Sequence, residues 1–358
     1  MISRRKLMQG AALGPAVLAR AEASSNRPLR YLQIGTGHAH ANKIEVYAES
    51  EDWDVIGIVE EDKALREKAR GNPAFNVHSF LEWGDGSLLG DIDVVGVETR
   101  IDRLLDYAHL AVEAGCHVHL DKPAGSDWAT YEDLMQKADA ADLVVQMGYM
   151  YRYNPAVLLL QRMLKAGWFG EIFETHAVMS KVIPPASRAE LGVYSGGTMF
   201  ELGCHIIDLT LGVLGAPEKV APFSRRVIDT PDDDLNDNML AVLEYPKATA
   251  TVRTTGLEVG GTGRRHITVC GTFGTCHIQP LDRPEMKLFL DRDRQFEGEE
   301  RVFRKGATMI PFQPPYRRYV GDAAALAQVV RGEIENPFPS SHDLAVQRTV
   351  LEASQMDG

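Results

Sequence analysis

The pattern of hydrophobic and polar positions changes character near residue 150. Before that point, short apolar runs alternate with helix-length amphipathic stretches; the runs are 29–34, 54–60, 91–99, 116–121 and 142–149. Such alternation is typical of a parallel, doubly wound sheet covered by helices. After it, one helix is followed by strand-like segments joined by Gly- or Pro-containing turns, which indicates an open, mainly antiparallel sheet. The pattern predicts an α/β domain over 28–150 and an α+β domain over 151–358.

The first apolar strand ends in a glycine-rich turn, "GTGHAH". Gly35 and Gly37 match the first two positions of G-x-G-x-x-G, and His40 stands at the third. The first glycine permits a tight turn and the second lets the backbone approach a pyrophosphate. The third mainly allows close packing of helix on strand, so His40 loosens the match without removing phosphate binding. The turn and later strand ends give the expected dinucleotide contacts: Gly35, Thr36, Gly37, His38, Ala39, Thr99, Asp121 and Lys122.

The second strand, "DVIGIVE", ends on Glu60, at the position where dinucleotide-binding folds place an acid on the adenosine ribose. Glu61 and Asp62 add negative charge, and no arginine stands beside them in the sequence. These charges should repel a ribose 2′-phosphate. The sequence therefore predicts NAD as the cofactor in preference to NADP.

The segment "HVHLDKPAG" raises the question of why an apolar strand ends in a lysine. Lys122 follows the strand at the edge of the sheet where parallel sheets bind ligands. A solvated strand end would also explain it. Its place at the ligand edge favours a catalytic role.

The segment 195–215, "SGGTMFELGCHIIDLTLGVLG", is predicted to be an apolar helix with a polar stripe. Glu201, His205 and Asp208 are spaced i, i+4 and i+7, so an α-helix would place all three on one face. Ionisable groups in such a stripe are costly unless they are paired, bind a metal or face a wet pocket. Glu and His at this spacing could share a cation, but there is no HExxH motif and no further ligand is evident. Proton transfer is the favoured interpretation, without a metal.

In combination, four motifs resemble the Gfo/Idh/MocA family, whose members include glucose–fructose oxidoreductase and inositol dehydrogenase: "GTGHAH", "DKP", "GYMYRYNP" and "GGTMFELGCHIID". The resemblance implies a Rossmann domain, an open C-terminal sheet, and nicotinamide-dependent oxidation or reduction of a hydroxyl of a sugar or cyclitol. It makes Lys122 the catalytic lysine, with Asp121 where the family has Glu. It makes His205 the general base and Glu201 its acidic partner, where Asp is usual. Glu201 or Asp208 would orient the imidazole.

Composition narrows the class of ligand. The 358 residues carry a net charge of −12 without a basic stripe, which argues against nucleic acid and anionic membranes. A small soluble ligand is therefore expected, and the family resemblance implies that it is sugar-like. We also expect a homo-oligomer formed through the C-terminal sheet. Four cysteines show no metal-like spacing; Cys270 and Cys276 could be joined in an oxidising compartment, although free thiols are the commoner outcome.

The first residues resemble an export signal. Arg4 and Arg5 precede a modest apolar stretch, residues 7–18, and an Ala-Glu-Ala site at 21–23. We predict a twin-arginine signal over 1–23 and a periplasmic or otherwise exported protein. Because such a compartment lacks a ready NAD pool, the predicted oxidoreductase would hold its cofactor tightly.

Two other functions fit the same pattern. One is an exported NAD-dependent glycosidase that oxidises its substrate transiently to promote elimination. The other is a non-catalytic sugar-binding protein on the same fold. The presence of both Lys122 and His205 disfavours the latter.

Overall fold

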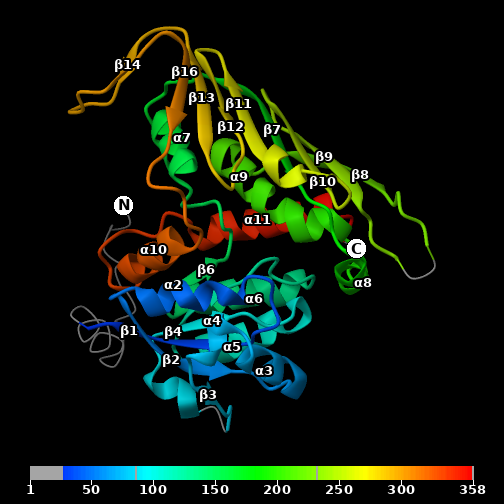
Figure 1. Ribbon diagram of the computed structural model, residues 1–358. Coiled ribbons are helices and arrows are strands. Elements are labelled where there is room, and N and C mark those ends of the chain that lie inside the picture. The colour runs from blue at the N-terminus through cyan, green and yellow to red at the C-terminus, as the bar shows by residue number, and fades with distance from the viewer. Residues whose placement is uncertain (1–26, 85–86, 231–232, 357–358) are drawn as a thin grey trace, which may run out of the picture.

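The computed structural model describes residues 27–84, 87–230 and 233–356. The predicted signal, residues 1–23, lies outside them. The described chain contains two large β-sheets, with helices between them (Figure 1). One sheet belongs to the N-terminal half of the sequence and the other to the C-terminal half.

Six parallel strands form the first sheet, in the order β3-β2-β1-β4-β5-β6. Their bounds are β1 (Leu29–Ile34), β2 (Trp53–Val59), β3 (Phe80–Leu81), β4 (Val94–Val97), β5 (His117–Leu120) and β6 (Val145–Met147). The strand order reverses beside β1, which lies between β2 and β4. Ligands of doubly wound sheets bind beyond the carboxyl ends of the strands at such a reversal. The predicted Rossmann architecture is confirmed.

Helices and short helical turns connect these strands. They are η1 (Ala41–Lys43), α2 (Ile44–Glu49), α3 (Lys63–Arg70), α4 (Pro73–Asn76), η2 (Ser87–Asp91), η3 (Ile101–Arg103), α5 (Leu104–Glu113) and α6 (Trp128–Ala140). Two of them begin at an aspartate that caps the first turn: Asp62 accepts hydrogen bonds from the backbone at the start of α3, and Asp127 does so for α6. These caps fix where each connection leaves the ligand edge of the sheet.

Eight strands form the second sheet, in the order β16-β13-β12-β11-β7-β10-β9-β8. Their bounds are β7 (Ile172–Ser180), β8 (Lys219–Arg225), β9 (Asn238–Glu244), β10 (Thr249–Thr255), β11 (His266–Gly271), β12 (Gly274–Ile278), β13 (Glu285–Leu290) and β16 (Gly306–Pro311); β14 (Arg294–Gln295) and β15 (Val302–Phe303) form a separate hairpin. β7 and β10 are parallel, and the other neighbours are antiparallel. The predicted open, mainly antiparallel sheet is confirmed.

One face of this sheet packs on helices and the other is open. α7 (Pro155–Lys165) and α9 (Cys204–Leu214) lie under the sheet, on the side of the first domain, and α8 (Pro185–Gly192) lies beyond its edge (Figure 1). Burial alternates along the strands: in β9, Met239, Ala241 and Leu243 are buried, whereas the residues between them are half-buried. The alternation matches the period of two expected for a sheet with one covered face.

The stretch 195–215 is helical but is not one regular α-helix. Met199–Gly203 forms a π-helical turn, and α9 follows it to Leu214, after which Gly215 adopts a φ of 75°. The absent side chain at Gly203 leaves room for Met199 to fold over this turn, since a Cβ there would lie 2.4 Å from the Met199 Sδ. A π-turn is wider than an α-turn, so the side chains before it do not stay aligned with those after it.

The last two helices return to the first domain. α10 (Val320–Val330) places Leu326 in the same apolar core as β1 and α2. Gln146 in the middle of β6 donates to the Asp322 carbonyl over 3.2 Å. Gln347 of α11 (Ser340–Ala353) donates to the Gly125 carbonyl over 2.7 Å. The stretch 151–358, expected to form one C-terminal domain, thus also completes the first.

All four cysteines are free thiols. Cys270 and Cys276 lie on the neighbouring strands β11 and β12, but Cys276 is paired in register with Val269 and Cys270 with Thr275, so the two thiols lie on opposite faces. The bridge that the sequence left open is not formed. No helix among the described residues is long and apolar enough to cross a membrane.

Candidate active site

Lys122 lies where β5 ends, in a buried position between the two domains. Its side chain is 1% exposed, and its peptide bond to Pro123 is cis. The Nζ atom donates to the Glu201 Oε1 over 2.9 Å and to the Glu201 carbonyl over 3.0 Å. Burial disfavours the ammonium, but Glu201, Cys204 and Asp121 together outweigh burial and raise the pKa of Lys122. The lysine is therefore a cation, and it is not at a solvated strand end.

Glu201 reaches Lys122 from the π-helical turn before α9. Burial would raise the pKa of this carboxyl, but Lys122 and then His38 hold it below its usual value. The ion pair crosses from the second domain to the first. No hydrogen bond joins Glu201 to His205 among the described residues, so the polar stripe expected from an α-helix is split by the π-turn.

His205 occupies the first turn of α9 and is 2% exposed. Burial lowers the pKa of the imidazole well below its usual value, and the cation of Lys122 lowers it further. The ring is neutral near pH 7. Its Nδ1 is buried and has no hydrogen-bond partner among the described residues. The rings beside it belong to His40, Tyr149 and Tyr151, with centroids 5.8, 6.2 and 5.9 Å away.

Asp208 does not orient His205 as expected. Its carboxylate accepts from Arg152, with the Nη2 atom 2.6 Å away, and from His342 over 3.0 Å. Asp343 also contacts the Arg152 guanidinium. Burial would raise the pKa of Asp208, but Arg152 outweighs it. This carboxylate balances a buried arginine that ties α9 to α11, a role that spacing along one helix cannot reveal.

Asp121 lies at the centre of a buried polar cluster beneath the glycine-rich turn. Its Oδ1 accepts from the Lys122 backbone N–H over 2.6 Å and lies 3.2 Å from the His40 Nδ1. Its Oδ2 lies 2.8 Å from the His38 Nδ1 and 3.1 Å from the Lys43 Nζ. Burial would raise the pKa of Asp121, but the surrounding donors hold it well below its usual range. We expected this residue to touch the cofactor; its carboxylate instead holds four donors in place.

Lys43, Glu98 and His119 extend this cluster and were not predicted from the sequence. The Lys43 Nζ lies 2.9 Å from both the Glu98 Oε1 and the His119 Nε2. Burial and the neighbouring Asp121 raise the pKa of Glu98 well above its usual value, against the opposing effect of the Lys43 cation. In the sequence, His119 stands out only as a polar position in the alternating strand "HVHL". In the structure it is 1% exposed, so the alternation did not reveal its burial.

The glycine-rich turn has the close backbone approach that a dinucleotide requires. Gly35 has a φ of 92°, and a Cβ there would lie 2.7 Å from the backbone N of Thr99. In the part of the chain that the structure describes, the backbone N–H groups of Gly37 and Ala39 make no hydrogen bond, whereas that of His38 donates to the Glu98 carbonyl. Two free N–H groups on an unobstructed turn fit a pyrophosphate.

Glu60 lies in a pocket of about 300 Å³ beside this turn. Its Oε2 accepts from the Thr36 backbone N–H over 2.7 Å and from the Thr36 hydroxyl over 2.8 Å. Thr36, which was expected to touch the cofactor, thus holds Glu60 in place. The pocket is the right size and chemistry for a ribose beside a fixed carboxylate, and its lining includes Gly37 and Thr99.

Two arginines enter the same pocket, contrary to the sequence-based expectation that none stands near the acids. Arg100 and Arg103 line it from the connection after β4, paired with Asp102 over 3.1 Å and with Asp106 over 2.8 Å. They are distant from Glu60 in the sequence, so only the fold brings them there. Each is already neutralised by its own aspartate.

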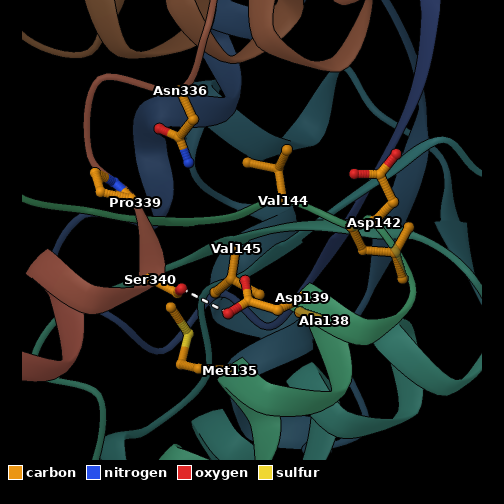
Figure 2. A pocket seen from close by; sticks show the side chains of 10 residues that line it. Met135, Ala138, Asp139, Asp142, Val144, Val145, Asn336, Pro339 and Ser340 are labelled. Carbon is orange, nitrogen blue, oxygen red and sulfur yellow. Dashed lines mark hydrogen bonds between the residues drawn. The ribbon is translucent and has the colours of Figure 1, made fainter. Parts of the chain in front are cut away.

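A second pocket, of about 260 Å³, lies away from these residues (Figure 2). Val144 and Val145 at the amino end of β6 line it, and Ser340 at the start of α11 donates to Asp139 over 2.6 Å. Lys122 lies at the carboxyl end of the neighbouring strand, so the two places are at opposite edges of the sheet. The candidate active site is the edge that holds Lys122, His205 and the glycine-rich turn.

The fold and this edge define an NAD(P)-dependent oxidoreductase with a Rossmann domain and a sheet domain. Two family models match consecutive parts of the chain: the oxidoreductase family with an NAD-binding Rossmann fold over residues 29–149, and the GFO/IDH/MocA C-terminal domain over residues 157–277. The chain belongs to the Gfo/Idh/MocA family of oxidoreductases, as its motifs predicted.

Individual relatives resemble the chain at modest identity. The uncharacterized oxidoreductase YdgJ of Escherichia coli is 26% identical over 316 residues, which are 84% of this chain and 82% of YdgJ. The D-glucoside 3-dehydrogenase of E. coli is 26% identical over 210 residues, 54% of this chain and 56% of that protein. The WlbA dehydrogenase of Bordetella pertussis, solved in complex with NADH and UDP-GlcNAcA, shares the fold with a TM-score of 0.71 at 17% identity, over 92% of this chain and 97% of WlbA.

Proposed function

We propose that this oxidoreductase transfers a hydride between NAD and a carbon that bears a hydroxyl in a sugar, cyclitol or glycoside. The observation that carries the proposal is the buried meeting of Lys122, Glu201 and His205 at the ligand edge of the Rossmann sheet. A cation and a neutral imidazole at this place have the charges that the chemistry needs. A binding protein without catalysis would have no use for this costly arrangement.

The cofactor would be held by the turn and pocket described above. Gly35 and Gly37 leave space for the pyrophosphate, the N–H groups of Gly37 and Ala39 would donate to it, and Glu60 would accept from the adenosine ribose. Bound NAD(P) supplies the carbon that accepts or returns the hydride.

The protein residues would move the proton and stabilise the charge. His205, neutral at pH 7, would take the hydroxyl proton as the hydride leaves the same carbon. Lys122 would donate to the developing alkoxide from its fixed position. Glu201 would keep the lysine charged and aimed. In the direction of reduction, His205 returns the proton.

A hydrogen-bond donor on the second domain, Lys181, supports a substrate rich in hydroxyls. Lys181, just after β7, is partly buried, and burial lowers its pKa, with Glu201 and Lys122 among the charges that act on it. It makes no side-chain hydrogen bond or ion pair within the described residues. The relatives that act on a D-glucoside or bind a UDP-sugar are consistent with this substrate class.

Turnover by a Lys122→Met variant tests the proposal. Purified protein is incubated with NAD and D-glucose, myo-inositol or methyl β-D-glucoside, and NADH is followed by its absorbance. Loss of a positioned donor at developing charge typically lowers turnover roughly 100- to 1,000-fold. We expect that loss in Lys122→Met and a comparable one in His205→Ala, with folding and NAD binding retained. Wild-type turnover in either variant would contradict the proposed chemistry.

A further part of this proposal concerns how the enzyme keeps its cofactor. We propose that the cofactor is held tightly, which denaturation of the purified protein and analysis of released NAD would check. Release of phenol from an aryl glycoside, with no net change of NADH, would instead favour the glycosidase alternative.

The export signal over 1–23 stays a prediction. If it is correct, replacement of Arg4 and Arg5 by lysine should leave precursor in the cytoplasm.

A further inference from the structure

The third position of the glycine-rich motif holds His40, where a glycine would allow close helix–strand packing. The His40 ring does not turn out to solvent, since its side chain is only 14% exposed. It lies between the Asp121 carboxylate, after β5, and the His205 ring of α9. The departure from the motif therefore introduces an imidazole into the active site.

One ring nitrogen of His40 contacts the Asp121 carboxylate, and the other makes no hydrogen bond among the described residues. The Nδ1 lies 3.2 Å from the Asp121 Oδ1, and an ionised carboxylate there requires the proton to be on Nδ1. The Nε2 is then an unprotonated acceptor. No hydrogen bond to this atom is formed by the described residues.

His205 has a ring nitrogen that lacks a hydrogen-bond partner and could donate to His40. Its Nδ1 is buried and has no hydrogen-bond partner among the described residues, and a buried polar atom without a partner is unfavourable. The carboxylates expected to serve it are engaged elsewhere, Glu201 with Lys122 and Asp208 with Arg152. The Tyr151 hydroxyl donates to Asp282.

We propose that His40 is the positioning residue of His205, in a chain Asp121–His40–His205. In this chain the His40 Nε2 accepts the Nδ1–H of His205 when substrate and cofactor close the site. The ring centroids are 5.8 Å apart at an interplanar angle of 42°, so the two rings are neighbours, and the proposal includes a ring rotation that brings these nitrogens within hydrogen-bond distance. Catalytic hydrogen bonds are often long in a free enzyme and shorten in the complex. The inference rests on the proposed function, because it assigns the partner of its general base.

The chain accounts for the proton without any further reactant. In oxidation, the O–H bond of the substrate breaks and its proton binds the His205 Nε2, while the C–H electron pair goes to NAD as hydride. The imidazolium so formed is stabilised because its Nδ1–H donates to His40, which Asp121 holds. In reduction, the same proton returns to the carbonyl oxygen.

The surroundings keep His40 neutral, as an acceptor must be. Burial lowers the pKa of His40 to about 4, against the opposing pull of Asp121. Lys122 and His38 also lower it, and the Tyr319 ring before α10 lies 5.8 Å away. Neutral His40 and neutral His205 therefore face each other at pH 7.

A His40→Gly variant tests the inference, because it restores the motif glycine and leaves a space shaped for imidazole. With the substrate of highest turnover in the panel above, we expect kcat to fall roughly 10- to 100-fold, as for loss of a partner of a functional histidine. The KM for NAD should change little. Added imidazole should restore part of kcat, and most strongly above the pKa of free imidazole, where the acceptor is neutral.

Two variants serve as controls. His38→Gly removes a ring that binds the same Asp121 carboxylate but makes no ring contact with His205, so imidazole should not restore its kcat. Tyr149→Phe removes the remaining free hydroxyl beside His205. A fall in kcat for Tyr149→Phe with none for His40→Gly would assign the partner role to Tyr149 and overturn the inference. Loss of NAD binding by His40→Gly without imidazole rescue would also overturn it, because the ring would then act only on the turn.

A second readout needs no substrate. The 15N chemical shifts of His205 in the complex with NAD distinguish its two neutral tautomers, and we expect Nδ1–H in the wild type and a mixture in His40→Gly. The Nε2–H tautomer in the wild type would contradict the chain. If Lys122→Met and His205→Ala keep wild-type turnover, the proposed function fails; if they lose it while His40→Gly does not, only this inference fails.

Discussion

Glu60 combines a fixed position with free capacity to accept hydrogen bonds. Thr36 donates twice to its Oε2, and the Asp62 backbone N–H donates to its Oε1 over 3.1 Å. The carboxylate cannot turn away from the pocket, so a 2′-phosphate brought there would meet a negative charge held in place. A 2′-hydroxyl would meet an acceptor instead.

Changing the charge at Glu60 and Glu61 should change which of the two cofactors the enzyme prefers. In Glu60→Ser combined with Glu61→Arg, we expect the ratio of kcat/KM for NAD over NADP to fall, because repulsion of the phosphate is replaced by attraction. Glu67→Arg, on the exposed side of α3, controls for added charge. Tighter binding of NADP than NAD by the wild type would contradict this role of Glu60.

How far a residue could be predicted depended on where its partner lies in the sequence. The places of Lys122 and Glu60 at the ligand edge were predicted because each follows a strand, and strand ends are visible in the pattern of apolar residues. Asp208 was given the wrong partner, because Arg152 reaches it from a loop before α7 and only packing brings them together. Lys43 was missed for the same reason, since its partners follow β4 and β5.

The π-turn before α9 shows what periodicity can and cannot predict for an element. The apolar pattern of residues 195–215 correctly indicated a helix, which the structure has over Met199–Leu214. It assumed 3.6 residues per turn, and the wider turn at Met199–Gly203 moved Glu201 onto Lys122. π-turns occur often at functional sites. Here the turn separates Glu201, which pairs with Lys122, from His205, the proposed general base.

α10 carries a buried acid that should make stability depend on pH. Asp322 is 2% exposed, its Oδ2 has no partner among the described residues, and burial raises its pKa from 3.8 to about 6. The folded state then binds this proton more tightly than the unfolded state. The contribution is full below the unfolded pKa of 3.8 and is lost as pH rises through about 6.

Removal of this charge should stabilise the protein at neutral pH. We expect Asp322→Asn to raise the free energy of unfolding at pH 7.5 by up to about 3 kcal/mol, from 1.36 kcal/mol per pKa unit, and to leave it nearly unchanged at pH 4. Urea denaturation at the two pH values measures both. Asp343→Asn would be a poor control because Asp343 pairs with Arg152, so Asp139→Asn on the surface is used. Equal effects at both pH values would contradict titration of Asp322 as the cause.

At the scale of the whole molecule, no helix of the described residues covers the open face of the eight-stranded sheet (Figure 1). Phe223 of β8 is 51% exposed on this face and is paired in register with Leu240, and Ala221 is paired with Val242. We propose that two copies associate through it. Light scattering should show a dimer or larger assembly for the wild type and a smaller species for Phe223→Glu with Val242→Glu. Val77→Glu, exposed on the first domain, is the matched control, and a monomeric wild type would contradict the proposal.

The two sheets followed from the sequence, but their connection through the last helices did not. Strands buried on both faces and strands buried on one face have different patterns, so the change near residue 150 was visible. Nothing in the pattern of 320–353 indicated which domain these helices join. That choice depends on a matching apolar surface on β1 and α2, far away along the chain.

The packing of α10 against β1 and α2 has a consequence for how the protein folds as it is synthesised. A ribosome releases β1 and α2 long before α10, so Tyr31, Ile44 and Tyr47 have emerged well before Leu326, which packs in the same core. The apolar core of the Rossmann half therefore stays incomplete until α10 has emerged, however early the six strands pair. Because the whole second sheet lies between α2 and α10 in the sequence, that sheet is synthesised before the core of the first domain can close.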